Sequence, residues 1–332
     1  MPLYPLDDSP THAELGAGRR KDADFDLVEE GEVFEPVSVR IDADKLLSYA
    51  FAQGDYGSWY FGDSPFGGPI GHPLLLANDL LFLFYEHYDG NTARGLHTHE
   101  QLGFHAPVRF GETVTVSGVY SQKYVSRGRG YVVLEAEARG EDGRLLVTHR
   151  GTEIMRTVTS EVAGRSLGSP QGRRVEAVID ASLPVAERAR PGIPPRSGVP
   201  GVSRHFTQDQ MSTFSWLSHG YRNVHTDIER ARESGVGRTI VQALQQTGLI
   251  TQAMVAFFGE SWFTSGRLDM RYTHPAFCRE QLTVGAAVLG EADGRLELEV
   301  WVDADTGART ALGWASAAIG SDERRPAPLL PW

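Results

Sequence analysis

The sequence predicts an α+β protein made of two similar halves, and three observations support this fold class. An ungapped alignment matches residues 41–57 with residues 206–222, and each segment has the pattern of a short amphipathic helix running into a turn. In each half a glycine-containing turn then opens an apolar segment of helical length. Each half ends in long runs of alternating apolar and polar residues, the pattern of antiparallel strands with one buried face.

The first matched pair of segments keeps the character of each position. Acidic, aliphatic and aromatic positions coincide, as in Asp44 with Asp209, Leu46 with Met211, and Tyr49 with Phe214. The apolar helices that follow are expected in SPFGGPIGHPLLLANDLLFLFY of the first half and in SGVGRTIVQALQQTGLITQAMVAFF of the second.

The strands repeat as well. Residues 105–118 and 273–286 share a proline followed by a Glu-x-apolar-Thr-Val run. The alternating segments 131–155 and 295–319 each contain a turn of the kind that closes a hairpin, Glu-Asp-Gly and Asp-Thr-Gly. A long apolar helix needs a sheet to cover it, and an antiparallel sheet with one buried face supplies that cover. We therefore predict a double hotdog: two tandem hotdog domains, each an antiparallel sheet wrapped around a long central helix.

The 332 residues suit about two domains. We expect a flexible arm over residues 1–23, an N-terminal hotdog domain over 24–158, a linker over 159–200 and a C-terminal hotdog domain over 201–322. The linker is rich in Gly, Ser, Pro and Arg, and only its residues 175–179 have the pattern of a short strand.

Composition excludes several classes of protein. The net charge of −11 argues against binding to a nucleic-acid backbone, and the single cysteine, Cys278, excludes an intrachain disulfide and a cysteine-only zinc site. The N-terminus has no signal-peptide pattern, and the longest apolar run, residues 73–85, is too short to span a membrane. We expect a cytoplasmic protein that contacts neither nucleic acid nor membrane.

Two sets of motifs resemble a known family. The run Asn223-Val224-His225-Thr226-Asp227, with the later Ala231, Gly235 and VGRTIVQALQQTG, resembles the MaoC-like hydratase/dehydratase pattern Gly-Asp-x-Asn-Pro-Ile-His-x-Asp and its continuation. In the first half, Gly54-Asp55, Ser58-Trp59-Tyr60 and SPFGGPIGHP are similar to the N-terminal dehydratase-like domain of the same group. The resemblance covers about residues 25–157 and 196–320.

The resemblance implies an acyl-thioester substrate, carried on coenzyme A or a carrier protein, and no cofactor or metal. The implied reaction is the reversible hydration of a 2-enoyl thioester to the (R)-3-hydroxyacyl form, so the enzyme would be a hydro-lyase. In it, an aspartate and a histidine act on one water as general base and acid. Backbone N–H groups at the start of the central helix would stabilise the enolate, and the turns at Gly67-Gly68 and Gly235/Gly237 would give the bare backbone this needs.

Neither half carries the complete Asp–His pair. In the second half His225 is present, but the family's Asp falls on Gly220 and its Asn on Arg222, or on Asn223 with a one-residue gap. In the first half Asp55 is present, but Tyr60 occupies the His position.

Three explanations remain open. Asp55 and Tyr60, helped by His72, would form a modified site in the first half. Alternatively, His225 would use a replacement partner, His219 or Asp227, in the second. Otherwise the scaffold would serve related chemistry, such as isomerisation, cyclisation, thioester hydrolysis or acyl binding without catalysis. A hybrid of Asp55 and His225 is less favoured, because the two sites of a hotdog pair normally lie on opposite sides of the interface.

The candidate site is therefore a set of residues from both halves. The catalytic candidates are His225, Asp55 and Tyr60. The substrate-binding candidates are Trp59, Gly67, Gly68, His72, Asn223 and Gln242. Each also has a structural reading: a helix start for His225, an Asx turn for Asp55, and aromatic packing for Trp59 and Tyr60.

Two further parts of the sequence contain ionisable side chains in patterns that could serve chemistry. Asp79, within an apolar helix, would be the base or nucleophile of a thioesterase, although a polar contact at the interface is the favoured reading. The run HTHEQLGFH, with His97, His99, Glu100 and His105, would place two imidazoles on one strand face, but we expect a strand along the interface rather than a metal site. Two halves already form a pair, and a homodimer is a further expectation.

Overall fold

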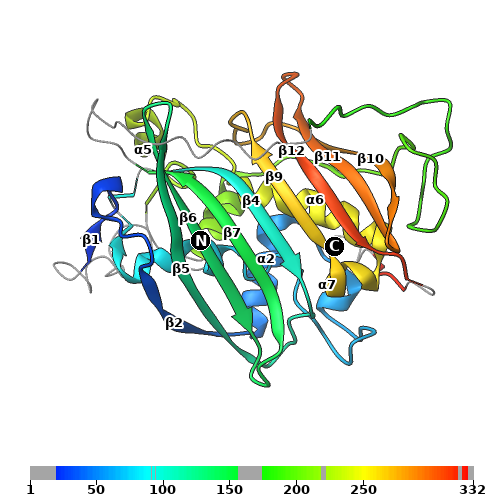
Figure 1. Ribbon diagram of the computed structural model, residues 1–332, viewed down its shortest axis with the longest axis horizontal. Coiled ribbons are helices and arrows are strands. Elements are labelled where there is room, and N and C mark those ends of the chain that lie inside the picture. The colour runs from blue at the N-terminus through cyan, green and yellow to red at the C-terminus, as the bar shows by residue number, and fades with distance from the viewer. Residues whose placement is uncertain are drawn as a thin grey trace.

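The computed structural model describes residues 20–90, 92–93, 95–155, 174–217, 222–320 and 324–327. One ten-stranded antiparallel sheet runs through both halves, in the order β2-β5-β6-β7-β4-β9-β12-β11-β10-β8 (Figure 1). Its strands are β2 (Val33–Arg40), β4 (Leu96–Phe104), β5 (Thr113–Ser126), β6 (Arg129–Arg139), β7 (Leu145–Ile154), β8 (Ser203–Arg204), β9 (Arg267–Tyr272), β10 (Leu282–Ala292), β11 (Arg295–Ala304) and β12 (Arg309–Ala318). A small parallel pair joins β1 (Lys21–Asp22) to β3 (Tyr88–Asp89).

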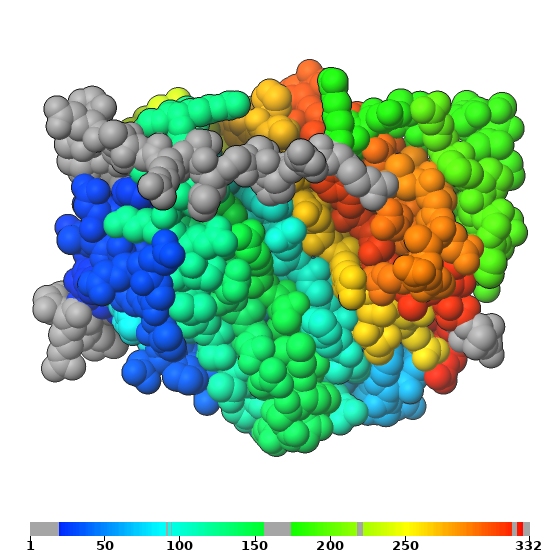
Figure 2. Space-filling model, viewed as in Figure 1, coloured from blue at the N-terminus to red at the C-terminus, as the bar shows by residue number. Residues whose placement is uncertain are grey.

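The seam between the halves is the pairing of β4 with β9. His99 lies opposite Arg271 and Gly103 opposite Arg267, with the Gln101–Asp269 pair between them. This register relates the two strands by an approximate twofold axis, so residues 99–104 of β4 have equivalents in residues 267–272 of β9. The sheet is therefore one surface shared by two hotdog units (Figure 2), which confirms the predicted double hotdog fold.

The helices cover one face of this sheet (Figure 1). They are α2 (Ala43–Gln53), α3 (Ala77–Leu81), α4 (Gln208–Trp216), α5 (Ile228–Glu233), α6 (Ala243–Phe258) and α7 (Glu260–Ser265), with short 3₁₀ turns η1 (Phe25–Leu27), η2 (Ser58–Tyr60) and η3 (Phe82–Glu86). None of the helices in the described ranges is long and apolar enough to cross a membrane.

The matched helices α2 and α4 pack together over the seam. Asp42 caps α2 by accepting from the Lys45 N–H at 2.9 Å, and Thr207 opens α4 with a capping box. The rings of Tyr49 and Phe214, which the sequence alignment paired, lie 5.9 Å apart. The helix repeat seen in the sequence therefore builds the contact between the two units.

The two central helices differ. In the second half α6 is one continuous helix, as predicted, whereas the first half has only the short α3 followed by η3. The expected long helix is wrong here, because the aromatic run after Leu81 winds more tightly. Residues three apart eclipse in a 3₁₀ turn, and the Phe82 and Tyr85 rings stack in parallel with centroids 5.2 Å apart.

The described part of the linker has no strand at residues 175–179. The backbone N–H groups of Glu176 and Ala177 instead donate to the Glu299 carboxylate, at 3.0 and 2.8 Å. A side chain thus satisfies the backbone groups that a neighbouring strand would have satisfied.

Candidate functional site

The first candidate centre lies where α2 ends. Gly54 closes the helix in the left-handed conformation, with φ of 64°, and the Asp55 N–H donates back to the Ala50 carbonyl at 3.1 Å. This turn directs the Asp55 side chain into the protein, where the residue is 7% exposed. Asp55 is thus buried rather than held in a surface turn.

Three of the predicted residues meet at this carboxylate. The Tyr60 hydroxyl donates to Asp55 Oδ2 at 3.4 Å, and His72 Nε2 lies 3.5 Å from the same oxygen. Tyr60 and His72 are both almost fully buried. The structure therefore assembles a carboxylate, a phenol and an imidazole from separate parts of the first half.

The backbone fixes the tautomer of His72. The Leu74 N–H donates to His72 Nδ1 at 3.0 Å, so Nδ1 is an acceptor and the ring proton lies on Nε2, which faces Asp55. Burial lowers the pKa of His72 to about 3. His72 is therefore neutral, and its Nε2–H faces the carboxylate in close contact without a hydrogen bond in this structure.

The Asp55 carboxyl has an unusual pKa for a different reason. Burial raises it from 3.8 to about 6, while the nearby Arg204 guanidinium and the Tyr60 hydroxyl act in the opposite direction. Arg204 comes from β8 of the second half and packs on Gly54, where any Cβ would clash with it. Sequence analysis did not identify Arg204, because no local pattern shows that β8 reaches this turn.

Aromatic rings close this centre. Trp59 packs against Phe66 of the same segment and Phe263 of α7, with ring centroids 6.3 and 5.8 Å away. A cavity of about 10 Å³, roughly the space of one water, lies beside Pro73, the residue that follows His72. Its walls are Pro73, Phe104, Ala106, Pro107, Val108, Val147 and Phe263. Trp59 is thus part of the aromatic packing around the centre, and Phe263 is a wall residue that sequence analysis missed.

The Gly67-Gly68 turn adopts a conformation that favours glycine, with φ of 84° and 87°. No atom lies close to either Cβ position, so the turn geometry, rather than a close neighbour, requires glycine. The donors expected at the helix start are already used, because the Leu74 and Leu75 N–H groups both bond back to His72.

In the second half, His225 occupies the position of Tyr60. Backbone bonds show the equivalence: the Ile70 N–H donates to the Trp59 carbonyl, and the Ile240 N–H donates to the Val224 carbonyl. His225 Nδ1 donates to the Ile240 carbonyl at 2.8 Å, which leaves Nε2 as the acceptor. Burial lowers the pKa of His225 to about 4, so the ring is a neutral base.

Asn223 and Gln242 surround this histidine in different ways. Asn223 braces the loop, accepting from the His225 N–H and donating to the Ser215 hydroxyl. Gln242 is the N-cap residue of α6, and its Nε2 is buried without a hydrogen-bond partner among the described residues. The N–H groups of Ala243 and Leu244 also have no partner within the described chain, so the expected helix-start donors are available in this half.

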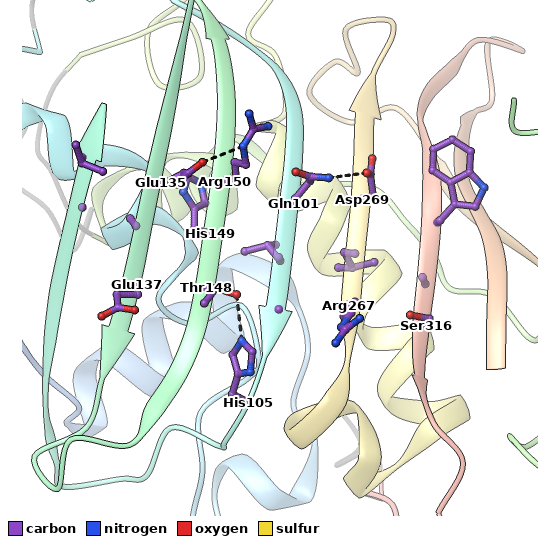
Figure 3. Close-up of a pocket in the computed structure, with 18 of the residues that line it drawn as sticks. Gln101, His105, Glu135, Glu137, Thr148, His149, Arg150, Arg267, Asp269 and Ser316 are labelled. Carbon is purple, nitrogen blue, oxygen red and sulfur yellow. Dashed lines mark hydrogen bonds and ion pairs between the residues drawn. The ribbon is translucent and has the colours of Figure 1, made fainter. Parts of the chain in front are cut away.

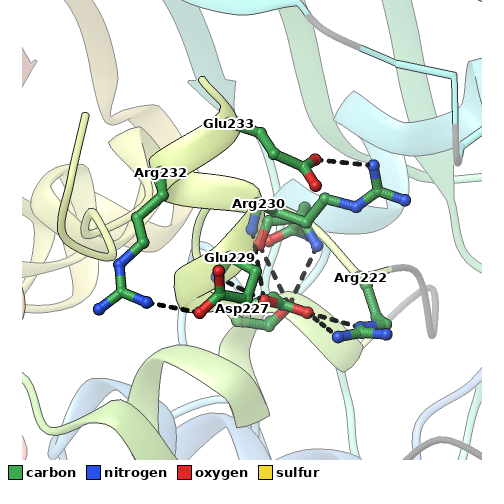
Figure 4. A network of polar contacts seen from close by, with 8 residues as sticks. Arg222, Asp227, Glu229, Arg230, Arg232 and Glu233 are labelled. Atoms are coloured by element: carbon green, nitrogen blue, oxygen red, sulfur yellow. Dashed lines mark hydrogen bonds and ion pairs between the residues drawn. The ribbon is translucent and has the colours of Figure 1, made fainter. Parts of the chain in front are cut away.

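The proposed partners of His225 do not supply a carboxylate. His219 and Gly220 lie outside the described residues. Asp227 caps α5 by accepting from the Glu229 and Arg230 N–H groups, and it also pairs with Arg222 (Figure 4). Asp227 therefore serves as the cap of α5. The contacts of Asp227 do not support it as the partner of His225.

Asp79 is paired as well. Its carboxylate contacts Lys45 Nζ at 2.9 and 3.0 Å, which joins α3 to α2. This is the polar packing contact that the sequence favoured, although it forms within the first half. A carboxylate neutralised in this way is a poor nucleophile for thioester hydrolysis.

The histidines of residues 97–105 do not share one face. A bulge between His97 and His99 shifts the register of β4 against β7, so the prediction of two imidazoles on one face is wrong. His97 contacts Glu100 under the sheet, whereas His99 contacts Asp269 on the outer face. In the part of the chain that the structure describes, no three His, Cys, Asp or Glu side chains are placed to hold a metal ion. As predicted, β4 runs along the interface.

A groove of about 850 Å³ lies on the outer face of the sheet and spans both halves (Figure 3). Paired polar side chains line it, including Arg150 with Glu135 and Gln101 with Asp269. None of the predicted site residues lines this groove. The candidate centres therefore lie on the helix side of the sheet.

Comparison with protein families identifies one domain. Residues 194–308 match the family described as the MaoC like domain. This range contains His225, Asn223 and Gln242 together with α6. Among the curated proteins, none matches this chain.

Solved structures share the fold over most of the chain. A MaoC-domain dehydratase from Chloroflexus aurantiacus is 14% identical and has a TM-score of 0.70, covering 91% of this chain and 99% of its own. A Mycobacterium tuberculosis protein described as a double hotdog is 16% identical, with a TM-score of 0.59 and coverages of 90% and 98%. The Drosophila melanogaster peroxisomal multifunctional enzyme type 2 is 19% identical, with a TM-score of 0.60, and the likeness covers 87% of this chain and 48% of that one.

Proposed function

From the premise that residues 194–308 form a MaoC-like domain within a double hotdog, we propose that the protein is an acyl-thioester hydratase/dehydratase. The proposed reaction interconverts a 2-enoyl thioester and an (R)-3-hydroxyacyl thioester of coenzyme A or a carrier protein. The observation that supports it best is the meeting of Asp55, Tyr60 and His72 in the first half. This group restores a carboxylate–imidazole pair that the aligned motif positions lack.

In this proposal Asp55 is the acid–base group. Its pKa of about 6 leaves it largely ionised at neutral pH, yet basic enough to accept a proton from water as the water oxygen adds to Cβ. The protonated carboxyl then returns a proton to Cα, so the addition of water is balanced. The reverse sequence removes water from the hydroxyacyl form.

Tyr60 and His72 hold the carboxylate in place. Burial and the Asp55 charge raise the pKa of Tyr60 well above its ordinary value, so the phenol stays protonated and donates. His72 stays neutral and presents Nε2–H to the same oxygen. Tyr60 therefore orients Asp55 by a hydrogen bond and His72 by close contact, and neither competes with it for the transferred proton.

The acyl group would enter beside Phe263. The cavity beside Pro73 takes one water, and an acyl chain needs the surrounding rings to move. Trp59 and Phe263 come from different halves and meet by ring contact at 5.8 Å, without a hydrogen bond that would fix them. Rotation of these side chains is the opening that the proposal requires.

The test is an ultraviolet hydration assay with crotonyl and longer 2-enoyl coenzyme A thioesters. We expect loss of the conjugated thioester absorbance with the wild-type protein. The Asp55→Asn variant should be slower by at least about tenfold, because it keeps the shape but cannot take a proton. Absence of hydration on every chain length would contradict the reaction class. Release of free thiol instead would indicate thioester hydrolysis, which the pairing of Asp79 with Lys45 does not favour.

A further inference from the structure

A second group of acid–base side chains is buried at the seam, away from Asp55. Glu100 of β4 is 0% exposed, and its two carboxylate oxygens contact different histidines. His97 Nε2 lies 2.7 Å from Oε2, and His149 Nε2 lies 3.1 Å from Oε1. One carboxylate thus joins two imidazoles from adjacent strands, on the helix side of the sheet.

The other nitrogens of both rings are unpaired. His97 Nδ1 and His149 Nδ1 are buried without a hydrogen-bond partner among the described residues, and so are His149 Nε2 and both Glu100 oxygens, whose contacts with one another are close ion-pair contacts. The side chains of His97 and His149 are 9% and 0% exposed. Buried polar atoms are nearly always satisfied, so two unpaired ring nitrogens in one cluster indicate a group that binds there.

The electrostatics give the two rings different roles. Burial opposes protonation of His97, but the hydrogen bond and charge of Glu100 raise its pKa above the ordinary value, which favours the imidazolium form with Nδ1–H as a donor. The two histidines in turn keep the pKa of Glu100 low, at about 2, despite burial. A histidine whose Nε2–H faces Glu100 accepts through Nδ1 when the ring is neutral and donates through Nδ1 when it is protonated. With one ring protonated and the other neutral, the cluster offers one proton donor and one acceptor.

Tyr272 links this cluster to the second-half counterpart of the first-half cavity. The seam register makes Tyr272 the equivalent of Phe104, which lines the cavity beside Pro73. The Tyr272 ring lies 5.1 Å from His97, and its hydroxyl bonds to Thr247 of α6 at 2.7 Å. The cluster thus lies where the second hotdog unit would hold its own substrate.

We propose that His97, Glu100 and His149 form a second acid–base centre, on the second half's side of the seam. The ligand would be an acyl thioester: a 2-enoyl thioester together with a water, or a 3-hydroxyacyl thioester through its β-hydroxyl group. The inference rests on the proposed reaction class but not on the Asp55 centre.

The proton transfers balance with two imidazoles. In hydration, His149 Nδ1 takes a proton from water while the oxygen forms its bond to Cβ, and His97 Nδ1–H gives a proton to Cα as the double bond is lost. His149 then carries one proton more and His97 one fewer. Exchange with solvent returns both rings to their starting state, and Glu100 remains ionised between them.

The test compares matched histidine variants in the Asp55→Asn background. In His149→Gln and His97→Gln the amide nitrogen can still donate to Glu100, but the titratable ring nitrogen is gone. His99→Gln is the control, because His99 lies on the same strand and faces Asp269 on the outer side. We expect either inner-face variant to lower the hydration rate remaining in Asp55→Asn by at least about tenfold, and His99→Gln to leave that rate unchanged.

Equal rates in Asp55→Asn and Asp55→Asn/His149→Gln, with both proteins folded by circular dichroism, would overturn the second centre. If the wild type hydrates no enoyl thioester, the proposed function fails, and a binding readout still decides the second centre. In that case the histidine ring resonances of the wild-type protein are followed by NMR on addition of 3-hydroxybutyryl coenzyme A. Shifts of His97 and His149 without His99 support the site, and unchanged resonances overturn it.

Discussion

The two halves share one fold but contain different candidate groups. The first half has a buried carboxylate beside a phenol and an imidazole, but its central helix is broken and the amides at the helix start are used. The second half has a continuous central helix, helix-start amides without partners in the described chain, and a neutral imidazole at His225. Duplication thus kept the scaffold twice, while each copy kept different parts of the site.

The seam shows the same division. Phe104, at the first half's end of β4, packs against Trp262 of α7, whereas its equivalent Tyr272 bonds to Thr247 and contacts His97. The first-half end is therefore apolar and the second-half end polar. One sheet therefore has two different chemical environments at the two ends of its seam.

The largest expected effect on stability is at the aromatic contact between the two halves. Phe263→Ala removes a fully buried ring that packs on Trp59 and Phe66, and it should lower the free energy of unfolding by about 3–5 kcal/mol. Urea denaturation of the purified variant measures this change. A loss below about 1 kcal/mol would mean that the ring packs loosely and that the centre is already open.

A second prediction concerns the stability cost of ionising Asp55 in the first half. Because the pKa of Asp55 is raised to about 6, ionising it costs stability in the folded state. The penalty is absent below the ordinary pKa of 3.8, grows as the pH rises, and is complete above about pH 6. Asp55→Asn should therefore be more stable than wild type at pH 8, by on the order of 2 kcal/mol, and show no gain at pH 3.5.

Thermal unfolding of both proteins at the two pH values checks this prediction. A variant that is less stable than wild type at pH 8 would show that the ionised carboxylate contributes to folding. Asp55 would then be a structural group rather than an acid–base group kept at a cost to stability.

A third prediction tests the link between the halves. Arg204→Gln removes the charge that the second half presents to Asp55, so the pKa of Asp55 should rise further above 6. The rising limb of the pH–rate profile should move to higher pH, while the rate at the plateau stays close to wild type. Arg204→Lys is the matched control, since it keeps the charge, and an unmoved limb in Arg204→Gln would separate Arg204 from the centre.

The smallest effect is expected at Asp79. Its contact with Lys45 is mostly buried, so Asp79→Asn should cost about 1–3 kcal/mol of stability by leaving the ammonium without its partner. The hydration rate per folded molecule should not change. A large loss of rate without a loss of stability would restore Asp79 as a catalytic group.

Much of the fold could be predicted, because periodicity reports which side chains are buried. The repeat at Tyr49 and Phe214, the hairpin turns and the strand along the seam all follow from local patterns. The break in the first central helix could not be predicted from local patterns, because aromatic packing decides there between an α-helix and a 3₁₀ turn. The bulge between His97 and His99 likewise depends on register, which the sequence alone does not show.

The candidate site was predictable only in part. Asp55, Tyr60 and His72 were each identified from motifs, and the first-half alternative already grouped them. Their common contact depends on the fold of the intervening segment. Arg204 shows the limit of sequence reasoning, because it acts on a residue that is distant in the chain and carries no motif of its own. Glu100 stands in the run HTHEQLGFH, but its contact with His149 depends on the pairing of two strands.

The central claim is that the first half holds the working carboxylate. The most direct measurement is the initial rate of crotonyl coenzyme A hydration by wild type, Asp55→Asn and His225→Ala under identical conditions. The account predicts a loss of at least about tenfold in Asp55→Asn and a rate within about threefold of wild type in His225→Ala. Full activity in Asp55→Asn together with loss in His225→Ala would contradict it and place the reaction in the second half.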